Sequence, residues 1–331
     1  MDNLLLNPGP TNTLDCVKRA QIKGSDVCHR TQEFLDLLLE TKKNLLSRFS
    51  SSASFKIWEI AMFSGSGTAA MESLISSLLS KTTVIVAGKY GKRAADMMSL
   101  YSVTAKKIDC ATKDELKTSN KKDNLYFVEN ETTTGEKFDL KTITTLYPNS
   151  RLFIDATSAF GATDYTEYLD NIDAVSFCSN KCLQSTPGLG VVIWRKTLSV
   201  FDKSFYLSLN KYKDNSLPFT LPVQCVAALN SALNNSKTPE KIMNARKNRL
   251  IGDFSEMGIQ CLNKYPSNSI IGFRHPIKSY EELRDFLKEK NIVIYDGIEG
   301  IENSFRVATM SVEFDRSYGY LLRSFRDSCI C

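Results

Sequence analysis

The 331-residue chain carries 42 Lys and Arg against 37 Asp and Glu, a formal net charge of +5, and its 42% hydrophobic and 24% charged residues are typical of a globular protein. The basic residues are spread along the chain, without the clustered Lys and Arg that recognition of a nucleic-acid backbone requires. We therefore expect no nucleic acid among its partners.

The nine cysteines include no CxxC pair and are accompanied by only two histidines, so the sequence indicates neither a zinc site nor a disulfide framework. The first apolar run, Leu4 to Leu6, ends before Pro8 and is too short for a signal peptide. No later run approaches the roughly 20 apolar residues of a membrane span. We expect a soluble, cytoplasmic protein with reduced thiols and no bound metal.

Short apolar or β-branched runs recur through the first two thirds of the chain, and helix-length segments separate several of them. The runs lie at Thr83–Ala87, Leu125–Val128, Leu152–Ile154, Ala174–Phe177 and Gly190–Trp194. This alternation predicts an α/β fold with a largely parallel sheet. Between Gly67 and Ser80 the apolar residues recur at helical spacing, so the Gly65–Thr68 turn opens a predicted helix.

The character of the sequence changes near residue 235. Polar, Lys-rich segments at Lys237–Arg249 and Glu281–Asn291 are separated by strand-like runs at Ile270–Phe273 and Ile292–Tyr295. This pattern indicates a smaller α+β domain. The predicted organisation is an N-terminal arm over residues 1–15, a large domain over residues 16–235 and a small C-terminal domain over residues 236–331.

Three short features suggest chemistry when they are taken together: the Gly65–Thr68 turn, Asp155 at the end of one apolar run, and Lys181 just beyond another. Singly, each has an ordinary explanation, as a plain turn, a capping residue or a solvated surface cation. As a set, they match the requirements of pyridoxal 5′-phosphate (PLP).

The phosphate of PLP needs N–H donors at a helix N-terminus, which Ser66, Gly67 and Thr68 are placed to supply. Its pyridine nitrogen needs a fixed anion, for which Asp155 is the candidate. Its aldehyde needs an amine made nucleophilic by burial and neighbouring charge, for which Lys181 is the candidate. We therefore expect PLP as the cofactor, with Lys181 as its covalent anchor.

Four stretches of the sequence resemble the class V aminotransferases, and the resemblance covers nearly the whole chain. They are Leu4–Pro10, Glu131–Gly135, Asp155–Gly161 and Ser179–Gln184. Within the class, they are most similar to the branch that uses 2-aminoethylphosphonate and pyruvate. The resemblance implies the type I fold of PLP-dependent transferases, in which a large domain carries the mostly parallel sheet and a smaller α+β domain follows.

Position by position, the resemblance implies further contacts with cofactor and substrate. Tyr90 would stack on the cofactor ring, and Thr132 would hydrogen bond near its phenolate oxygen. Thr220 would reach the phosphate of the neighbouring subunit's cofactor, so that the active site is complete only in a homodimer. Arg306 would grip the acidic group of the substrate, because its planar fork of donors fits a carboxylate or a phosphonate.

The implied activity is transamination between two small molecules, an amine donor and an oxo-acid acceptor. Transfer from 2-aminoethylphosphonate to pyruvate gives phosphonoacetaldehyde and alanine, and the reverse direction is equally compatible with the sequence. Four alternatives stay open: transamination of alanine or serine with glyoxylate or pyruvate, transamination of a phosphorylated amine, a lyase of the same fold, and a non-catalytic fold member. The joint presence of Asp155, Lys181, Tyr90 and the Gly65–Thr68 turn argues against the last, since a silent protein has no chemical need for all four.

Overall fold

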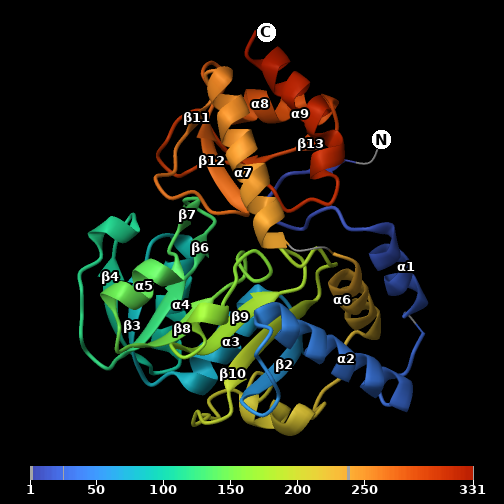
Figure 1. Ribbon diagram of the computed structural model, residues 1–331, viewed down its shortest axis with the longest axis vertical. Coiled ribbons are helices and arrows are strands. Elements are labelled where there is room, and N and C mark those ends of the chain that lie inside the picture. Colours follow the sequence, from blue (N-terminus) through green and yellow to red (C-terminus); the bar gives the residue numbers. More distant parts are fainter. Residues whose placement is uncertain (1–2, 25, 237–238, 331) are drawn as a thin grey trace.

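Two sheets of different size organise the chain in the computed structural model, which describes residues 3–24, 26–236 and 239–330. A seven-stranded sheet lies in the large part, in the lower half of Figure 1, and a four-stranded sheet lies in the C-terminal part above it. None of the helices in these residues is long and apolar enough to cross a membrane.

The large sheet has the strand order β2-β10-β9-β8-β5-β3-β4. Its strands are β2 (Trp58–Ser64), β3 (Lys81–Val86), β4 (Thr104–Asp109), β5 (Asn124–Val128), β8 (Arg151–Asp155), β9 (Ile172–Cys178) and β10 (Leu189–Arg195). Only β10 runs against the others, being antiparallel to both of its neighbours, β2 and β9. The predicted α/β fold with a largely parallel sheet is confirmed.

All five predicted runs of the large sheet form strands, whereas β2 and β4 were not predicted. Strand β4 lies at the sheet edge, and most of its residues, including Lys106 and Lys107, are exposed. An edge strand of this kind lacks the apolar run on which the prediction depended.

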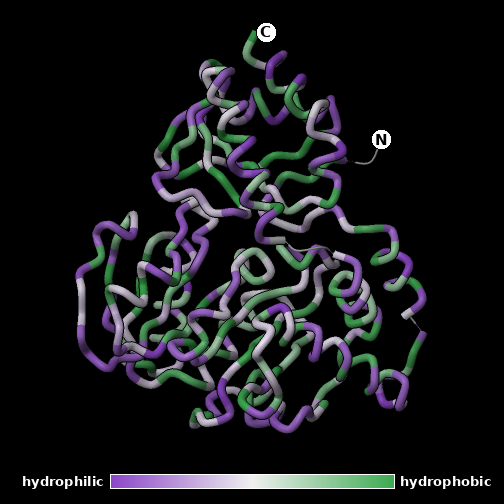
Figure 2. Tube along the Cα trace, in the orientation of Figure 1, coloured by the Kyte–Doolittle hydropathy of each residue, from purple (hydrophilic) through white to green (hydrophobic). Residues whose placement is uncertain are grey.

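The helices of the large part are α1 (Asp15–Lys23), α2 (Gln32–Phe49), α3 (Gly67–Leu78), α4 (Lys89–Leu100), α5 (Leu140–Leu146) and α6 (Val223–Asn235). They cover both faces of the sheet, as a parallel sheet requires. Ile60 of β2 belongs to the core that contains Phe49 of α2. Phe63 of the same strand packs in the opposite core, with Leu74 of α3. In Figure 2, hydrophobic stretches run through the interior and alternate with hydrophilic residues along the outer helices.

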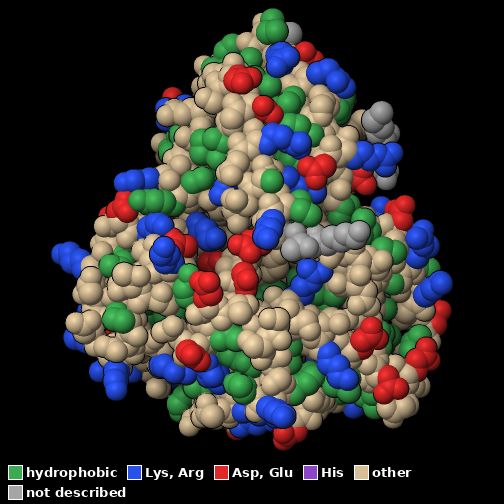
Figure 3. All heavy atoms as spheres, viewed as in Figure 1, with side chains coloured by type: hydrophobic (Ala, Val, Ile, Leu, Met, Phe, Trp, Pro, Cys, Tyr) green, Lys and Arg blue, Asp and Glu red, His purple; other side chains and the backbone are tan. Residues whose placement is uncertain are grey.

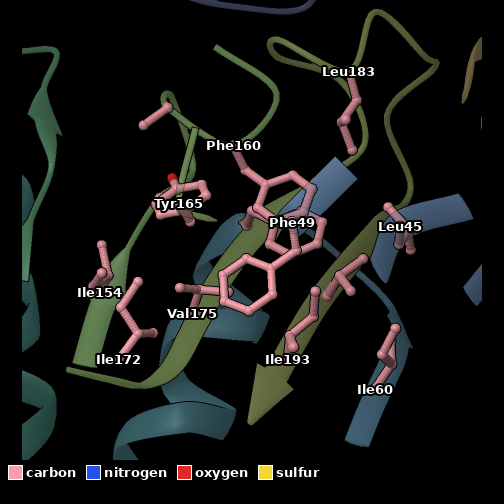
Figure 4. Close-up of a cluster of buried hydrophobic side chains, with 14 of the residues drawn as sticks. Leu45, Phe49, Ile60, Ile154, Phe160, Tyr165, Ile172, Val175, Leu183 and Ile193 are labelled. Atoms are coloured by element: carbon pink, nitrogen blue, oxygen red, sulfur yellow. The ribbon is translucent and has the colours of Figure 1, made fainter. Parts of the chain in front are cut away.

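Aromatic rings fix the chain segment that follows β8. Figure 4 shows Phe160 and Tyr165 gathered with Phe49 above the sheet. The rings of Phe160 and Phe177 stack with centroids 3.6 Å apart and an interplanar angle of 5°. Such ring pairs add about 0.5–1.5 kcal/mol beyond the burial of their area. The loop after Asp155 is therefore anchored to the core on one side.

The C-terminal part contains an antiparallel sheet with the order β11-β12-β15-β14. Its elements are α7 (Pro239–Glu256), β11 (Gln260–Cys261), β12 (Ile270–Arg274), α8 (Tyr280–Glu289), β13 (Ile292–Val293), β14 (Tyr295–Asp296), β15 (Ser304–Ala308) and α9 (Phe314–Ser328). Phe254 of α7 and Phe325 of α9 meet in its core, with ring centroids 4.6 Å apart.

The single strand predicted at Ile292–Tyr295 is wrong, because two short strands in different sheets occupy this segment. Strand β13 pairs in parallel with the N-terminal strand β1 (Leu4–Leu5), and β14 pairs with β15. The N-terminal residues therefore run along the C-terminal part. The boundary proposed between residues 235 and 236 falls just after α6.

Candidate active site

The predicted site residues follow the carboxyl ends of strands in the large sheet. Asp155 is the last residue of β8, and Lys181 comes just after β9. The Ser66–Thr68 turn follows β2, and Tyr90 follows β3 in the first turn of α4. These four strands run in the same direction, so their carboxyl ends share one edge of the sheet. Ligands of open α/β sheets bind outside this edge.

Lys181 is held by the N-terminal segment of the chain. Its Nζ donates a hydrogen bond to the carbonyl oxygen of Pro8. Gly9 packs so closely on the lysine that an added Cβ would lie 2.8 Å from Cδ and 2.9 Å from Nζ. Burial lowers the pKa of Lys181, which favours the neutral, nucleophilic amine at neutral pH.

Asp155 is a buried acid with 2% of its surface exposed. Its Oδ1 accepts a hydrogen bond of 2.9 Å from the backbone N–H of Thr157. Burial raises the pKa of Asp155 to about 6, although the Thr157 hydrogen bonds and the charge of Lys181 oppose this shift. A cationic partner held against the carboxylate would lower the pKa again.

The Ser66–Thr68 turn forms the N-terminus of α3. Ser66 is the N-cap, and its Oγ accepts from the backbone N–H of Thr68 at 3.2 Å. A Cβ added to Gly67 would lie 3.0 Å from the Thr157 side chain, so the turn packs against the segment that follows β8. Arg93 Nη1 donates to Thr68 Oγ1 at 3.1 Å. The helix N-terminus and this guanidinium together favour an anion.

Tyr90 and Thr132 lie side by side at the wall of a cleft of about 1140 Å³, which Lys181 and Arg306 also line. Burial raises the pKa of Tyr90. The guanidinium of Arg93 lies 4.8 Å from the centroid of the Tyr90 ring. Figure 3 shows charged side chains of both signs where the large and C-terminal parts meet.

Arg306 is buried in β15 and faces the large part across the cleft. Its Nη1 donates to the carbonyl oxygen of Thr132 and its Nε to that of Asp296, each at 2.5 Å. Its guanidinium also lies 4.9 Å from the centroid of the Tyr295 ring. These contacts bring Arg306 next to the residue predicted to bind the cofactor's phenolate oxygen.

Thr220 is not brought to this cleft within one chain. It is exposed in the segment before α6, and its Oγ1 lies 3.4 Å from Nε2 of His29. Among the described residues, those that line the cleft do not include Thr220, Asp155 or the Ser66–Thr68 turn. Asp155 and the turn are both in contact with Thr157, whereas the side-chain hydrogen bond of Thr220 leads to His29. The role predicted for it would need a second subunit.

The structure adds three residues to which the sequence analysis assigned no role: Pro8, Arg93 and Glu131. Glu131 is fully buried, and its Oε2 accepts from the backbone N–H groups of Tyr90 and Gly91, each at 3.1 Å. Pro8 and Glu131 belong to stretches that carried the family resemblance, and Arg93 is three residues from Tyr90 on α4. Those signals could have directed attention to them.

The chemistry of these groups fits PLP. A buried acid suits the ring nitrogen, and an amine of lowered pKa suits the aldehyde. A helix N-terminus beside a guanidinium suits the phosphate.

Comparisons with curated proteins point to one group of enzymes, although no protein-family model matches the chain. The 2-aminoethylphosphonate–pyruvate transaminase of Phocaeicola vulgatus is 26% identical, over 98% of both chains. That of Bacillus cytotoxicus is 28% identical, over 93% of this chain and 92% of the relative. Over nearly its whole length, the chain is thus similar in sequence to curated aminotransferases. It spans about half (54%) of a third relative, a bifunctional phosphonoacetaldehyde hydrolase/aminoethylphosphonate transaminase of Clostridioides difficile, at 27% identity over 93% of this chain.

Solved structures share the fold of this chain. An aspartate aminotransferase of Thermus thermophilus superimposes with a TM-score of 0.85, over 99% of both chains at 22% identity. A PLP-bound phosphoserine aminotransferase of Trichomonas vaginalis gives a TM-score of 0.80 at 15% identity, over 98% of this chain and 99% of that one. The expected aminotransferase architecture is thus confirmed.

Proposed function

We propose that the protein is a PLP-dependent aminotransferase that exchanges an amino group between 2-aminoethylphosphonate and pyruvate. The observation that carries this proposal is the juxtaposition of Lys181, Asp155 and the Ser66–Thr68 turn at one edge of the large sheet. The sequence similarity to the 2-aminoethylphosphonate–pyruvate transaminases supports the choice of substrates.

When bound, PLP supplies an electron sink for the carbon that bears the substrate's amino group. Ser66, Gly67 and Thr68 would hold its phosphate, and Asp155 would keep its ring nitrogen protonated. Lys181 would hold its aldehyde covalently until the incoming amine displaces the lysine. The freed Nζ, whose pKa burial lowers, is then suited to take the proton from that carbon and to return it on the cofactor side.

Arg306 would bind the acidic end of donor and acceptor in turn. A guanidinium fork can hold either a phosphonate or a carboxylate with two charge-assisted hydrogen bonds. Both substrates carry such a group two bonds or fewer from the reacting carbon. One arginine therefore suffices for both half-reactions.

The direct test is a spectrophotometric screen of the purified protein, loaded with PLP, against 2-aminoethylphosphonate, alanine, serine and phosphorylated amines. The proposal expects 2-aminoethylphosphonate, and alanine through the reverse half-reaction, to convert the cofactor to its amine form without an added acceptor, whereas serine and the phosphorylated amines leave it unchanged. Pyruvate should then restore the aldehyde form. Conversion by another donor only would assign a different substrate. A spectrum that no amine changes would exclude transamination by these donors.

The anchoring role of Lys181 is tested by borohydride reduction and peptide mapping. Lys181→Ala should abolish the reducible link and turnover. Lys92→Ala is the matched control, because Lys92 lines the same cleft but is exposed and paired with Asp96 at 2.9 Å. A labelled peptide that contains another lysine would contradict the assignment.

We further propose a cytoplasmic homodimer in which Thr220 completes the partner's site. Thr220 is exposed and does not line the cleft of its own chain. The ring of Phe219, the residue before it, lies 6.1 Å from that of Phe205, whose surface is 77% exposed, so this region offers apolar surface to a partner. Inactive Lys181→Ala and Thr220→Asp chains, mixed and allowed to exchange, should regain activity, because one site of each mixed dimer is intact. A fully active monomer would refute the shared site.

A further inference from the structure

We infer that Glu131 is a positioning residue, which fixes the ring of Tyr90 and the backbone of Thr132 around the cofactor. The inference rests on the proposed function, since it concerns the same site. It assigns a role to a buried carboxylate that touches neither cofactor nor substrate in the scheme above.

The start of α4 has no cap of its own. Its N-cap is Gly88, which has no side chain to satisfy the first N–H groups of the helix. A carboxylate from a distant segment replaces the missing cap. Glu131 Oε2 accepts from the N–H groups of Tyr90 and Gly91 at 3.1 Å each. The negative charge also suits the positive end of the helix dipole.

Thr133 completes this arrangement. Its hydroxyl donates to Glu131 Oε1 at 2.6 Å and accepts from the backbone N–H of Lys89 at 3.1 Å. A Cβ added at Gly88 would lie 2.5 Å from Glu131 Cγ and 2.6 Å from Thr133 Oγ1. The capping groups therefore occupy the space that only a glycine at position 88 leaves open.

The position of the Glu131 carboxylate affects the positions of three site residues. Tyr90 donates its N–H to Glu131, and Thr132 follows Glu131 directly in the chain. The carbonyl oxygen of Thr132 in turn accepts from Arg306 Nη1. A change at Glu131 should therefore alter the cofactor's surroundings first and the substrate clamp second.

The isosteric variant Glu131→Gln is the primary probe. An amide presents one acceptor oxygen and one donor NH₂, so it cannot accept on both sides as the carboxylate does. The NH₂ group of the glutamine then faces another donor, which is either the N–H pair of Tyr90 and Gly91 or the hydroxyl of Thr133. Glu136→Gln is the matched control, because Glu136 is also buried and accepts the backbone N–H groups of Lys264 and Tyr265 at 2.9 and 3.0 Å.

Both variants should lower the melting temperature by similar amounts, because each disturbs a buried carboxylate with two backbone donors. Only Glu131→Gln should raise the dissociation constant of PLP, by at least about tenfold, and change the circular dichroism of the bound cofactor. It should also lower kcat more than it raises KM. These readouts separate positioning from structural support.

Two results would overturn the inference. In one, Glu131→Gln keeps PLP affinity and cofactor dichroism within about twofold of the parent protein. In the other, Glu136→Gln disturbs the cofactor equally. If Glu131→Gln does not fold, Thr133→Val is the second probe, because it removes the hydroxyl that caps α4 beside Glu131. Changed circular dichroism of the bound cofactor in this variant supports the inference, and unchanged dichroism refutes it. A parent protein that binds no PLP would refute the proposed function, and this inference with it.

Discussion

Replacement of Asp155 by Asn should stabilise the cofactor-free protein while it disables the enzyme. The carboxyl of Asp155 is 2% exposed, and burial raises its pKa from 3.8 to about 6. One pKa unit corresponds to about 1.4 kcal/mol, so ionising this group costs the native state about 3 kcal/mol. An amide of the same shape avoids that cost and still accepts the N–H of Thr157 through its oxygen.

The pH dependence follows from the direction of the shift. Because the native state favours the protonated carboxyl, the cost is absent below the unfolded pKa of 3.8 and complete above the folded pKa of about 6. Cofactor-free Asp155→Asn should therefore exceed the parent by up to about 3 kcal/mol near pH 8. For a chain of this length, that corresponds to roughly 4 °C in melting temperature. The difference should shrink towards zero near pH 4.

Thermal or urea unfolding of the cofactor-free proteins at both pH values measures this difference. With PLP bound, the parent should be the more stable of the two proteins, because the neutral amide of the variant cannot hold the ring nitrogen protonated. Turnover of the variant should fall at least about a hundredfold for the same reason. A cofactor-free variant no more stable than its parent near pH 8 would show that the buried carboxylate carries no such cost. Near-normal turnover would refute its role in catalysis.

Three other substitutions test separate parts of the structure. Arg306→Lys should reduce kcat/KM by roughly tenfold to a hundredfold in both half-reactions, with an unchanged cofactor spectrum, because a planar fork becomes a point charge; values within twofold of the parent would place the anion site elsewhere. Gly9→Ala should lower the amount of cofactor trapped per subunit by borohydride at least about tenfold, because φ is +136° at Gly9 and the new Cβ would lie 2.8 Å from Lys181 Cδ. Full trapping would show that Lys181 does not need the space left by a glycine at position 9. Burial lowers the pKa of His275 from 6.5 to about 4, so its contribution to stability is complete above pH 6.5 and is lost as the pH falls towards 4, up to about 3 kcal/mol; His275→Gln should flatten this part of a stability–pH curve, and an unchanged curve would exclude His275 as its cause.

The sequence predicted those features that are written in local patterns. Apolar runs located five strands of the large sheet, and Asp155 and Lys181 stood out because each follows such a run. The direction of the strands then placed them at one edge. Strand β4 was not predicted because residues such as Lys106 face solvent and interrupt the apolar pattern. The segment from Ile292 was predicted as one strand, but it forms two short strands that pair with different partners.

Contacts between distant segments could not be predicted from one sequence. The carbonyl that receives the Lys181 amine lies 173 residues away, at Pro8. The carboxylate that caps α4 belongs to Glu131, 41 residues from Tyr90. Both residues lie in stretches that carried the family resemblance, but a backbone group forms half of each interaction, so no residue pattern names the partner. The pairing itself is visible only in the folded topology.

The two carbonyl contacts of Arg306 also bear on the thermodynamics of substrate binding. Nη1 and Nε are already bonded to the carbonyl oxygens of Thr132 and Asp296, so the long side chain is immobilised before any ligand arrives. Ordering a flexible side chain on binding ordinarily costs about 0.5–1.5 kcal/mol. Here that entropy is lost during folding, and the arginine meets each incoming anion as a preorganised receptor. Affinity is thereby gained without an additional contact.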